Sequence, residues 1–586
     1  MYKTLDPEPI SQFWNVWTKY SGLHNTAHVY HIGILSEFLG NNYQYYPTAN
    51  ILLKIVATLS IFPAVIVIFK NRLLAFLSSI LFSISSATAG SLFRVSNGND
   101  YVALTIMNIF FISYYWIFVK HSKGLLVLSA LLFFIAYLTS PGRIFPLLLL
   151  IFLVEIFWLL KLRNINNIGF SLVRIIFYLI PVFLISIPAP VSTCCPLISQ
   201  SHTLLKDIIS GSLFNLLDPF ASIGWTIFTN DYWRFFGIFD YKSLTNFGDY
   251  LSFLLKGPTF IFGTLTLILS LILVKKPLRF FLKVFIFNFT LEVLIFFIAN
   301  KHPTLTEADT FQLLLLRYPT LVSIYILTLA LIIFLSWRKN DLKSGVSNAL
   351  WVGPFISIIF LWPMWVIMGR LINDWHSVIR YFLWPALGTS LFVGVILSAF
   401  YERLKGKDFL RYLSVIIISI IIFNLYLNNK EAIQKEFLPE GAQKIKVTDQ
   451  RILQEKLVRK LDRSAQKGDL LIYFDFEQSD LGSQYYIEAL PVEALGVMLH
   501  VNRGKGTSGC IAGFTDQKVF KSSIKEKNNE IGFEYPGVCV NEDIVKAGLK
   551  ESTEPHFFTL DKFYAFSIEN GDFVDVKTDV LRELGI

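Results

Sequence analysis

Charged residues are scarce in this chain. Asp, Glu, Lys and Arg make up 16% of its 586 residues, whereas soluble proteins contain about 25%. Apolar residues account for 54% of the chain, and the mean hydropathy is +0.53. This composition excludes an ordinary soluble protein and predicts a protein that crosses a membrane several times.

Cysteine is also rare, with four residues in the whole chain. Four are too few for a disulfide-rich scaffold, and none stands in a metal-ligand spacing, so no metal site is expected. Cys194 and Cys195 are adjacent, and adjacent cysteines rarely bridge each other. Cys510 and Cys539 lie in the C-terminal part of the chain, where a bridge and two free thiols are equally compatible with the sequence.

The N-terminal segment, residues 1–48, lacks the basic and then apolar pattern of a secretory signal. It is polar and aromatic, and we expect it to lie on the outer membrane surface. Either this tail crosses the membrane unaided, or an initial transmembrane helix is absent from this chain. We favour the second explanation.

Twelve apolar segments follow, and each approaches the roughly 20 residues that span a bilayer core. They cover residues 49–69, 73–93, 100–119, 124–140, 143–160, 172–190, 258–274, 279–299, 317–336, 347–369, 380–401 and 409–427.

Basic residues are concentrated in every second gap between these segments. The six gaps Lys70–Arg72, Lys120–Lys123, Lys161–Arg174, Lys275–Arg279, Arg338–Lys343 and Arg403–Arg411 hold 17 Lys and Arg, against 6 in the short gaps between them. Because basic loops stay in the cytoplasm, the other gaps and both chain ends are predicted to lie outside. These loops largely account for the net charge of +9, which makes nucleic acid an unsuitable partner.

The composition divides the chain into three regions. Residues 1–48 form the outer N-terminal segment, and residues 49–428 form the membrane body, in which 191–257 is a long outer loop with interfacial helices. From about residue 429 charges become frequent, and strand patterns appear at Leu470–Phe476 and on both sides of Asn570-Gly571. We therefore predict a mainly α fold, a polytopic transmembrane helical bundle of about 12 spans. A soluble extracytoplasmic α/β or α+β domain is expected over 429–586.

Candidate catalytic acids stand at the start of the chain. Asp6 and Glu8 alternate with prolines that favour an extended backbone. A carboxylate at the boundary of water and lipid can take a proton from an acceptor hydroxyl. The alternative is a solvated, proline-rich tail.

Candidate substrate-binding cations lie at the outer ends of several segments. Arg380 and Tyr381 open one span, Arg143 follows a tight turn, and Arg94 borders a turn beside Asp100, with which it can pair. Such cations can hold a lipid phosphate and stabilise its charge as it leaves. An arginine at a helix end can also reach lipid headgroups in general.

His28 and His31, together with His24, occur close together in the N-terminal segment. They are either surface and packing residues or neighbours of the active site. A zinc site is not expected, because no fourth ligand is evident.

Glu155 and Glu292 lie inside apolar segments, where a charged carboxylate costs roughly 2.5–3.5 kcal/mol. Each should therefore be protonated, paired or facing a cavity. Proton-coupled transport would use such groups, but no basic partner is expected within the membrane.

Several motifs are similar to those of the membrane-embedded glycosyltransferases of the C superfamily, most closely the protein O-mannosyltransferase type. Tyr137–Leu147 resembles that family's Ser-Lys-Glu turn with the proline-rich helix after it, although Pro141-Gly142 replaces Lys-Glu. Arg380–Gly388 resembles its late Arg-Tyr motif. The segments Leu81–Ser85, Arg94–Asp100 and Phe38–Tyr43 resemble its early helices and their approaches.

This resemblance implies a glycosyltransferase that moves a sugar from a polyprenyl-phosphate donor to an acceptor protein, lipid or glycan on the extracytoplasmic face. Asp6 or Glu8 would be the base, and Arg380 with Arg143 would hold the phosphate. It implies a place in the bacterial cell envelope, as a multi-pass protein of the cell membrane whose activity includes protein glycosylation. A divalent metal is neither implied nor excluded. The rivals are a lipid-linked oligosaccharide flippase or transporter and an inactive membrane-anchored assembly protein.

Overall fold

A computed structural model provides the fold of the chain. It describes residues 45–89, 98–120, 122–162, 166–186, 258–300, 324–332, 347–368, 382–404, 408–437, 470–475, 509–514, 524–527, 530–533, 538–540 and 556–585, with the short pieces 31, 34–35, 38–39, 92, 223–224, 226, 406, 453, 456–457 and 460–461.

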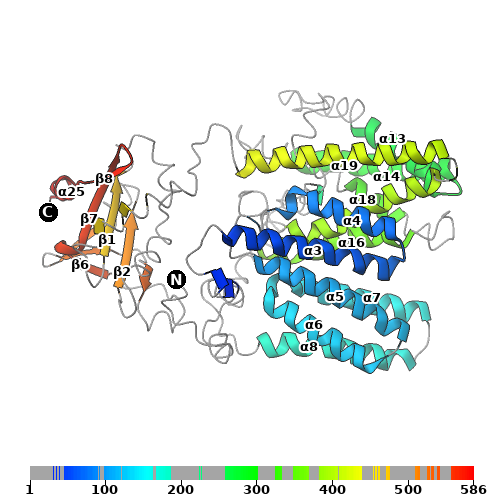
Figure 1. Ribbon diagram of the computed structural model, residues 1–586, viewed down its shortest axis with the longest axis horizontal. Coiled ribbons are helices and arrows are strands. Elements are labelled where there is room, and N and C mark those ends of the chain that lie inside the picture. The colour runs from blue at the N-terminus through cyan, green and yellow to red at the C-terminus, as the bar shows by residue number, and fades with distance from the viewer. Residues whose placement is uncertain are drawn as a thin grey trace. The chain divides into compact units, whose positions relative to one another are not determined.

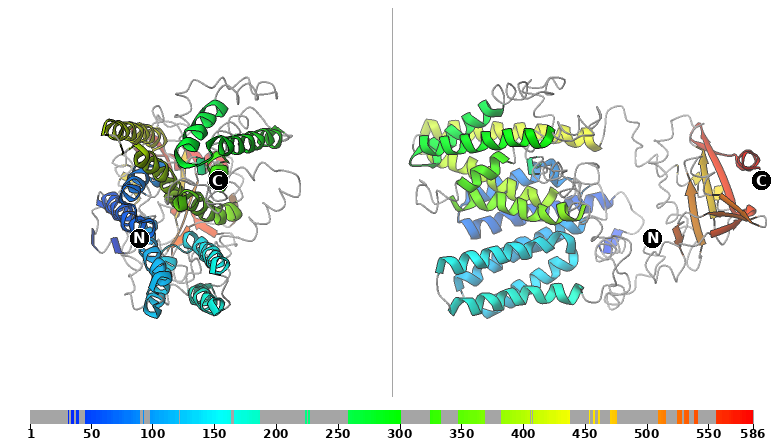
Figure 2. Two further views of the ribbon diagram at one scale, coloured as in Figure 1. Left: turned by 90° about the vertical axis from the view of Figure 1, so that its right-hand side faces the viewer. Right: turned by 180° about the vertical axis from the view of Figure 1, so that it is seen from behind.

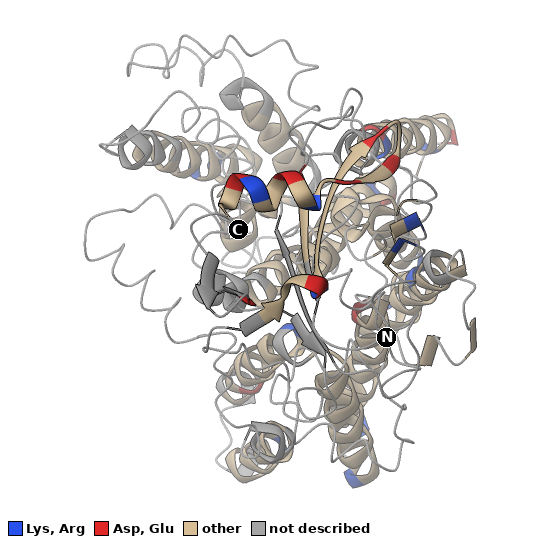
Figure 3. Ribbon diagram, turned by 90° about the vertical axis from the view of Figure 1, so that its left-hand side faces the viewer, with Lys and Arg blue, Asp and Glu red and all other residues tan. Residues whose placement is uncertain are grey.

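Contacts between Cα atoms divide the chain into two compact units. The helical unit comprises residues 39–188 and 192–437, and the C-terminal unit comprises 438–586 with residues 1–38 and 189–191. Figure 3 shows the difference in composition: charged residues line the last helix and hairpin of the C-terminal unit, whereas the long helices carry few.

The helical unit contains long helices that run side by side (Figures 1 and 2). Their bounds are α3 Tyr46–Phe69, α4 Arg72–Ile84, α5 Gly98–Lys120, α6 Lys123–Thr139, α7 Pro141–Leu162, α8 Asn166–Ser186, α13 Pro258–Leu273, α14 Pro277–Asn300, α16 Ser347–Met368, α18 Leu383–Leu404 and α19 Asp408–Phe437, with the short 3-10 helix η3 at Ser86–Thr88.

Four stretches of helix in the described part of the chain are long and apolar enough to cross a membrane. They are Thr48–Phe69, Gly98–Lys120, Leu383–Leu404 and Asp408–Glu431. Shorter apolar helices accompany them. The helices occupy the expected apolar ranges, apart from 73–93, where the helix ends at Ile84, and 317–336, of which only 324–332 are described. The count of 12 spans stays a prediction.

One helix ends earlier than the sequence predicted. The range 73–93 was expected to be continuous, but α4 ends at Ile84 because Ser85 adopts an extended backbone, with φ −63° and ψ 130°. The chain then turns through η3, where Thr88 donates hydrogen bonds from its hydroxyl to the carbonyls of Phe82 and Ser85. The hydroxyl of Thr88 thus bonds to backbone carbonyls at the point where the chain leaves the helix.

The turn between α3 and α4 is fixed by its own sequence. Lys70 ends α3 in the left-handed region, with φ 54°, and its N–H bonds to the carbonyl of Ile66. Asn71 then caps α4, since its side chain accepts a 2.9 Å hydrogen bond from the N–H of Leu74. The basic pair Lys70 and Arg72 therefore lies at a sharp helix end, as the charge pattern predicted.

Helix α18 is the most enclosed of the membrane-length helices, with 83% of its apolar window buried. It approaches α16 closely at two glycines. A Cβ added at Gly353 would lie 2.5 Å from the carbonyl oxygen of Gly388, so the two backbones touch. Ser357 joins the same seam by donating a 2.8 Å hydrogen bond to the carbonyl of Pro385. Small residues permit this packing, as in many membrane proteins.

The outward sides of the helices are apolar. Large side chains stand exposed along α3 and α19, including Leu59, Phe409 and Phe423 at 64%, 76% and 60% exposure. An apolar surface that follows whole helices matches a lipid environment, since soluble proteins rarely expose such patches.

The C-terminal unit contains two sheets. The first has the strand order β5-β2-β1-β7-β8, in which β1 is parallel to β2 and β7 while both edge strands are antiparallel. The second has the order β3-β4-β6 and is antiparallel. The bounds are β1 Leu470–Asp475, β2 Gly509–Phe514, β3 Ile524–Lys527, β4 Glu530–Phe533, β5 Val538–Val540, β6 His556–Thr559, β7 Phe563–Glu569 and β8 Asp572–Asp575, followed by helix α25 Lys577–Leu584.

The hairpin predicted at Asn570-Gly571 is confirmed. Strands β7 and β8 pair antiparallel, with Glu569 opposite Asp572. Asn570 and Gly571 both have positive φ, 50° and 71°, which is the conformation of the two-residue turn that Asn-Gly favours. The predicted strand at 470–476 is confirmed as β1, whereas the range Ile487–Val501 lies outside the described residues.

Candidate functional site

Two of the predicted site residues fall in the described part of the chain, namely Arg143 and His31. The other six lie outside it: Asp6, Glu8, His28, Arg94, Arg380 and Tyr381. The candidate site is therefore built from Arg143 outward. His31 is half-buried in a short helical piece that belongs to the other unit, so it is not combined with Arg143 here.

Arg143 belongs to a buried group that we call the Asp100 cluster, made of Asp100, Ser140 and Arg143. Its guanidinium Nη2 lies 3.9 Å from Asp100 Oδ2, and the two side chains are 6% and 1% exposed. The hydroxyl of Ser140 donates a 2.9 Å hydrogen bond to the other carboxylate oxygen, Oδ1. The arginine and the carboxylate are thus neighbours at a distance beyond an ordinary hydrogen bond.

Three helix ends bring this cluster together. Asp100 stands in the first turn of α5, where a carboxylate is favoured by the helix dipole. Ser140 ends α6, and its carbonyl accepts hydrogen bonds from the N–H groups of Arg143 and Ile144. The chain therefore turns directly from α6 into α7 and places Arg143 in the first turn of α7.

A second contact ties α5 to the same turn. The side-chain amide of Asn99 donates a 2.8 Å hydrogen bond to the carbonyl of Thr139, at the last turn of α6. Carbonyls at a helix end lack partners within the helix, so Asn99 supplies one. Two hydrogen bonds, from Asn99 to Thr139 and from Ser140 to Asp100, therefore fix the start of α5 against the end of α6.

More buried polar contacts join segments that are distant in sequence. The hydroxyl of Tyr101 donates to the carbonyl of Thr88 at 2.6 Å, and that of Ser85 donates to the carbonyl of Thr226 at 3.1 Å. The hydroxyls of Thr226 and Thr389 lie 2.7 Å apart. Through these contacts η3 and α18 are linked to the start of α5.

Helix α19 reaches the same network near its C-terminal end. The side-chain oxygen of Asn429 accepts a 2.9 Å hydrogen bond from the N–H of Ser86. The start of α5, the start of α18 and the end of α19 are the helix ends that the basic gaps assign to the outside. Several of the buried polar contacts thus lie at the end of the bundle that the sequence predicts to face outside.

The sequence also allowed Arg94 to pair with Asp100. Arg94 lies outside the described residues, so this expectation is untested, while the partner found for Asp100 is Arg143. The prediction missed this pair because residues 100 and 143 stand on different helices. No spacing rule within one segment connects them.

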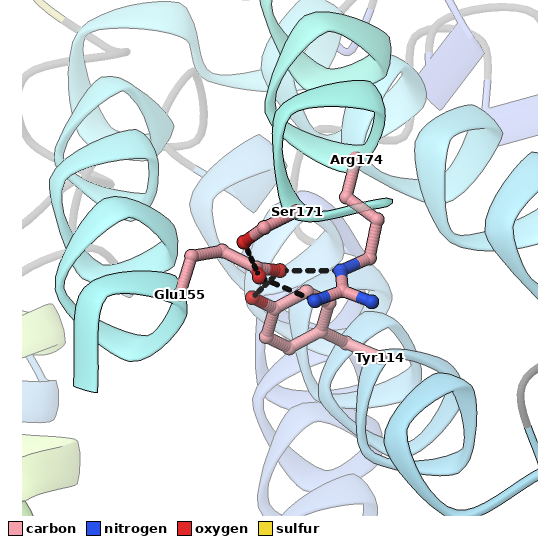
Figure 4. Close-up of polar contacts among 4 residues, drawn as sticks. All are labelled: Tyr114, Glu155, Ser171 and Arg174. Atoms are coloured by element: carbon pink, nitrogen blue, oxygen red, sulfur yellow. Dashed lines mark hydrogen bonds and ion pairs between the residues drawn. The ribbon is translucent and has the colours of Figure 1, made fainter. Parts of the chain in front are cut away.

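A second buried ion pair lies deeper in the helical unit, and sequence reasoning did not predict it. Arg174 of α8 binds Glu155 of α7 through two hydrogen bonds, 2.7 Å from Nε to Oε1 and 2.5 Å from Nη2 to Oε2 (Figure 4). The hydroxyl of Tyr114 donates to Oε1 at 2.9 Å, and that of Ser171 donates to Oε2. Both charged side chains are 0% exposed.

Aromatic rings enclose this pair, which we call the Glu155–Arg174 pair. The guanidinium carbon lies 4.7 Å from the ring centre of Phe118 and 4.6 Å from that of Phe170, within the range of cation–π attraction. Tyr178 stands nearby and shares a 2.6 Å hydrogen bond with Ser129. The charge is therefore buried together with several groups that compensate for lost water.

The expectation that Glu155 lacks a basic partner in the membrane is wrong. Arg174 was counted in the cytoplasmic gap 161–174, but α8 begins at Asn166 and carries Arg174 into the bundle. An available signal was the apolar sequence on both sides of Arg174, together with Ser171 one helical turn earlier. Without Arg174 the basic gaps hold 16 Lys and Arg, so the predicted sidedness is unchanged. The side chain of Glu292 lies outside the described set.

Among the described residues no three His, Cys, Asp or Glu side chains gather as a metal site would require. Comparison of the chain with protein-family models, with curated proteins and with solved structures gave no match.

Proposed function

We propose that this chain is an integral membrane glycosyltransferase of the cell membrane, which moves a sugar from a polyprenyl-phosphate donor to an acceptor on the extracytoplasmic face. The observation that carries the proposal is the Asp100 cluster: a buried arginine held at the end of the bundle that the basic gaps assign to the outside. The motif resemblance of the turn around Arg143 and of the segment before α18 supports the same reading.

The state of Arg143 suits a phosphate ligand. Its guanidinium is shielded from water, and low polarity strengthens its attraction for an anion. Asp100 lies 3.9 Å from it and supplies a counter-charge. Asp100 would keep the guanidinium of Arg143 oriented. A phosphate that approaches the helix ends would accept bidentate hydrogen bonds from this guanidinium.

The proposed reaction is an inverting transfer. Asp6 or Glu8 takes the proton of the acceptor hydroxyl, and the oxygen attacks the anomeric carbon of the donor. The bond from that carbon to the phosphate oxygen breaks, and polyprenyl phosphate leaves with both bonding electrons. Arg380 and Arg143 stabilise the negative charge that develops on the leaving phosphate. Tyr381, Arg94, His28 and His31 would contribute to substrate binding.

The Glu155–Arg174 pair overturns the earlier argument against a proton-coupled transporter, which was a missing basic partner, and supplies another one. A carboxylate that exchanges protons must change charge during the cycle. Glu155 receives hydrogen bonds from Tyr114, Ser171 and Arg174, and these buried contacts would have to rearrange at each such change. This arrangement is typical of a fixed structural pair.

The experiment is a transfer assay with the full-length chain in proteoliposomes, supplied with a panel of polyprenyl-phosphate hexoses and total envelope acceptors. We expect Arg143→Gln and Arg380→Gln to lower transfer about 100- to 1000-fold, as loss of a group that stabilises developing charge does. The double variant Asp6→Asn/Glu8→Gln should abolish it. Ser129→Ala is the matched control, because it changes a buried polar contact of α6 away from the cluster.

Unchanged transfer by Arg143→Gln and Arg380→Gln would remove both arginines from the site. A labelled sugar lipid that crosses the bilayer without forming a covalent product would support a flippase instead. Absence of both activities would favour the membrane-anchored assembly protein.

A further inference from the structure

The C-terminal unit brings two cysteines into register on neighbouring strands. Strands β2 and β5 pair antiparallel, and their pairing places Cys510 directly opposite Cys539. Gly509 faces Val540 and Ile511 faces Val538 on either side of this position. The chain has two other cysteines, Cys194 and Cys195, which lie outside the described residues.

This register meets the distance requirement of a disulfide. Directly opposed residues of antiparallel strands have Cα atoms about 4.5 to 5.5 Å apart, and disulfides join Cα atoms about 4.4 to 6.8 Å apart. Directly opposed residues also belong to the same face of a sheet, whereas a shift of one residue would put them on opposite faces. The pairing of β2 with β5 is thus the one that allows a bond.

The position of β5 gives such a bond a structural purpose. It has three residues, stands at the edge of the five-stranded sheet and is held there by β2. A strand of three residues makes few backbone hydrogen bonds to its neighbour, so a covalent link adds to its attachment. A covalent link from β5 to β2 would also close the loop that carries β3 and β4 of the second sheet.

We infer that Cys510 and Cys539 form an intramolecular disulfide that fastens the edge strand β5 to β2. The two thiols lose two protons and two electrons, which pass by thiol–disulfide exchange to an oxidised dithiol protein of the outer compartment. The inference rests on the outer placement of this unit in the proposed function and not on sugar transfer, because such bonds persist in oxidising compartments and are rare in the cytoplasm.

The test counts thiols in the full-length chain carrying Cys194→Ser and Cys195→Ser. Membranes are quenched with acid, denatured, and treated with a maleimide that adds a polyethylene glycol chain to each free thiol. We expect no labelled thiol before reduction and two after it. Cys510→Ser in the same background should expose one thiol without reduction, which shows that the partner is Cys539.

Two labelled thiols before reduction, or a dimer linked through these cysteines, would overturn the inference. If the background variant does not fold, mass spectrometry of the unreduced native chain gives the same decision, since peptides around residues 510 and 539 must appear joined. Sidedness is read separately from Arg582→Cys in a cysteine-free chain, with a membrane-impermeant maleimide on intact cells. Arg582 is 76% exposed on α25, so its replacement is accessible.

These readouts separate the two proposals. Labelling at position 582 from outside, combined with free thiols at 510 and 539, would overturn the bond and leave the orientation standing. If position 582 is not labelled from outside and the two thiols are free, both the bond and the predicted orientation are overturned. Loss of sugar transfer with the bond intact would leave the inference standing and count against the enzyme.

Discussion

Among its described residues, the helical unit holds two buried arginine–carboxylate pairs that differ in the distance between the two charged groups. Glu155 and Arg174 share two hydrogen bonds, and Tyr114 and Ser171 add two more to the carboxylate. Asp100 and Arg143 stand 3.9 Å apart, with Ser140 as the hydroxyl donor. Arg143 and Glu155 are twelve positions apart, or about 18 Å along α7 at 1.5 Å per residue.

The difference indicates different purposes for the same two residue types. A pair joined by two direct hydrogen bonds is a poor site for an anionic ligand, because the ligand would have to displace those short contacts. The Asp100 cluster instead lies at the helix ends, which is where an anion from outside the bundle would arrive. Under the proposed function, the Asp100 cluster is expected to take part in donor binding and the Glu155–Arg174 pair to stabilise the fold.

The largest effect is expected from breaking the Glu155–Arg174 pair. Glu155→Gln leaves the Arg174 charge buried without its counter-ion, which should lower the free energy of unfolding by about 3–5 kcal/mol. To measure this loss, the purified variant and the parent chain are heated in detergent. The fraction of each that stays monodisperse is then compared as the temperature rises. The double variant Glu155→Gln/Arg174→Gln should recover part of it, because no lone charge remains. Asp100→Asn is the matched variant at the other pair, where we expect a smaller loss of stability. An equal loss of stability would show that the two pairs do not differ in this respect.

A smaller effect is expected from removing one hydroxyl at each pair. Tyr114 and Ser140 each donate a 2.9 Å hydrogen bond to a buried carboxylate, so Tyr114→Phe and Ser140→Ala are matched. Tyr114→Phe should lower the free energy of unfolding by about 1.5–3 kcal/mol and leave sugar transfer intact. Ser140→Ala should raise the KM for the polyprenyl-phosphate donor, because Asp100 then moves relative to Arg143. Donor titrations in proteoliposomes measure the KM of both variants. A raised KM in Tyr114→Phe and an unchanged KM in Ser140→Ala would contradict the proposed roles of the two pairs.

The smallest effect is expected at an exposed carboxylate of the C-terminal unit. A hydrogen bond with the Thr559 side chain lowers the pKa of Asp561, and the charges of Lys562 and Lys577 add to that shift. A lowered pKa stabilises the fold above the unfolded pKa and loses its effect as the pH falls through the folded value. Asp561→Asn should therefore lower the melting temperature slightly at pH 7 and leave it unchanged at pH 2. A shift comparable to that of Glu155→Gln would show that burial does not decide the value of a charge in this chain.

The sequence predicted the elements better than their contacts. Apolar runs indicated the helices, and Asn570-Gly571 located the β7–β8 hairpin, because both signals are local. The early end of α4 followed from hydrogen bonds made by Thr88, which hydropathy does not register.

The polar pairs were beyond local patterns. Arg143 was identified as a candidate cation, but its pairing with Asp100 depends on how α5 and α7 are rotated toward each other. Arg174 was counted with the basic gap Lys161–Arg174 although the predicted span 172–190 contained it, and its partner Glu155 was then considered isolated. Rotation about the helix axis is set by packing across the whole bundle, which one segment does not encode.

The contact of Gly353 with Gly388 restricts the path of any polyprenyl tail. Where two backbones touch, no methyl group fits between them, still less an isoprenoid chain. The seam between α16 and α18 is therefore closed to lipid at that level, although α18 directly follows Arg380 and Tyr381 in the sequence. Under the proposed function, the donor would have to arrive along another side of α18. Bulky substitutions on that route would then block long-chain donors and spare short, water-soluble analogues.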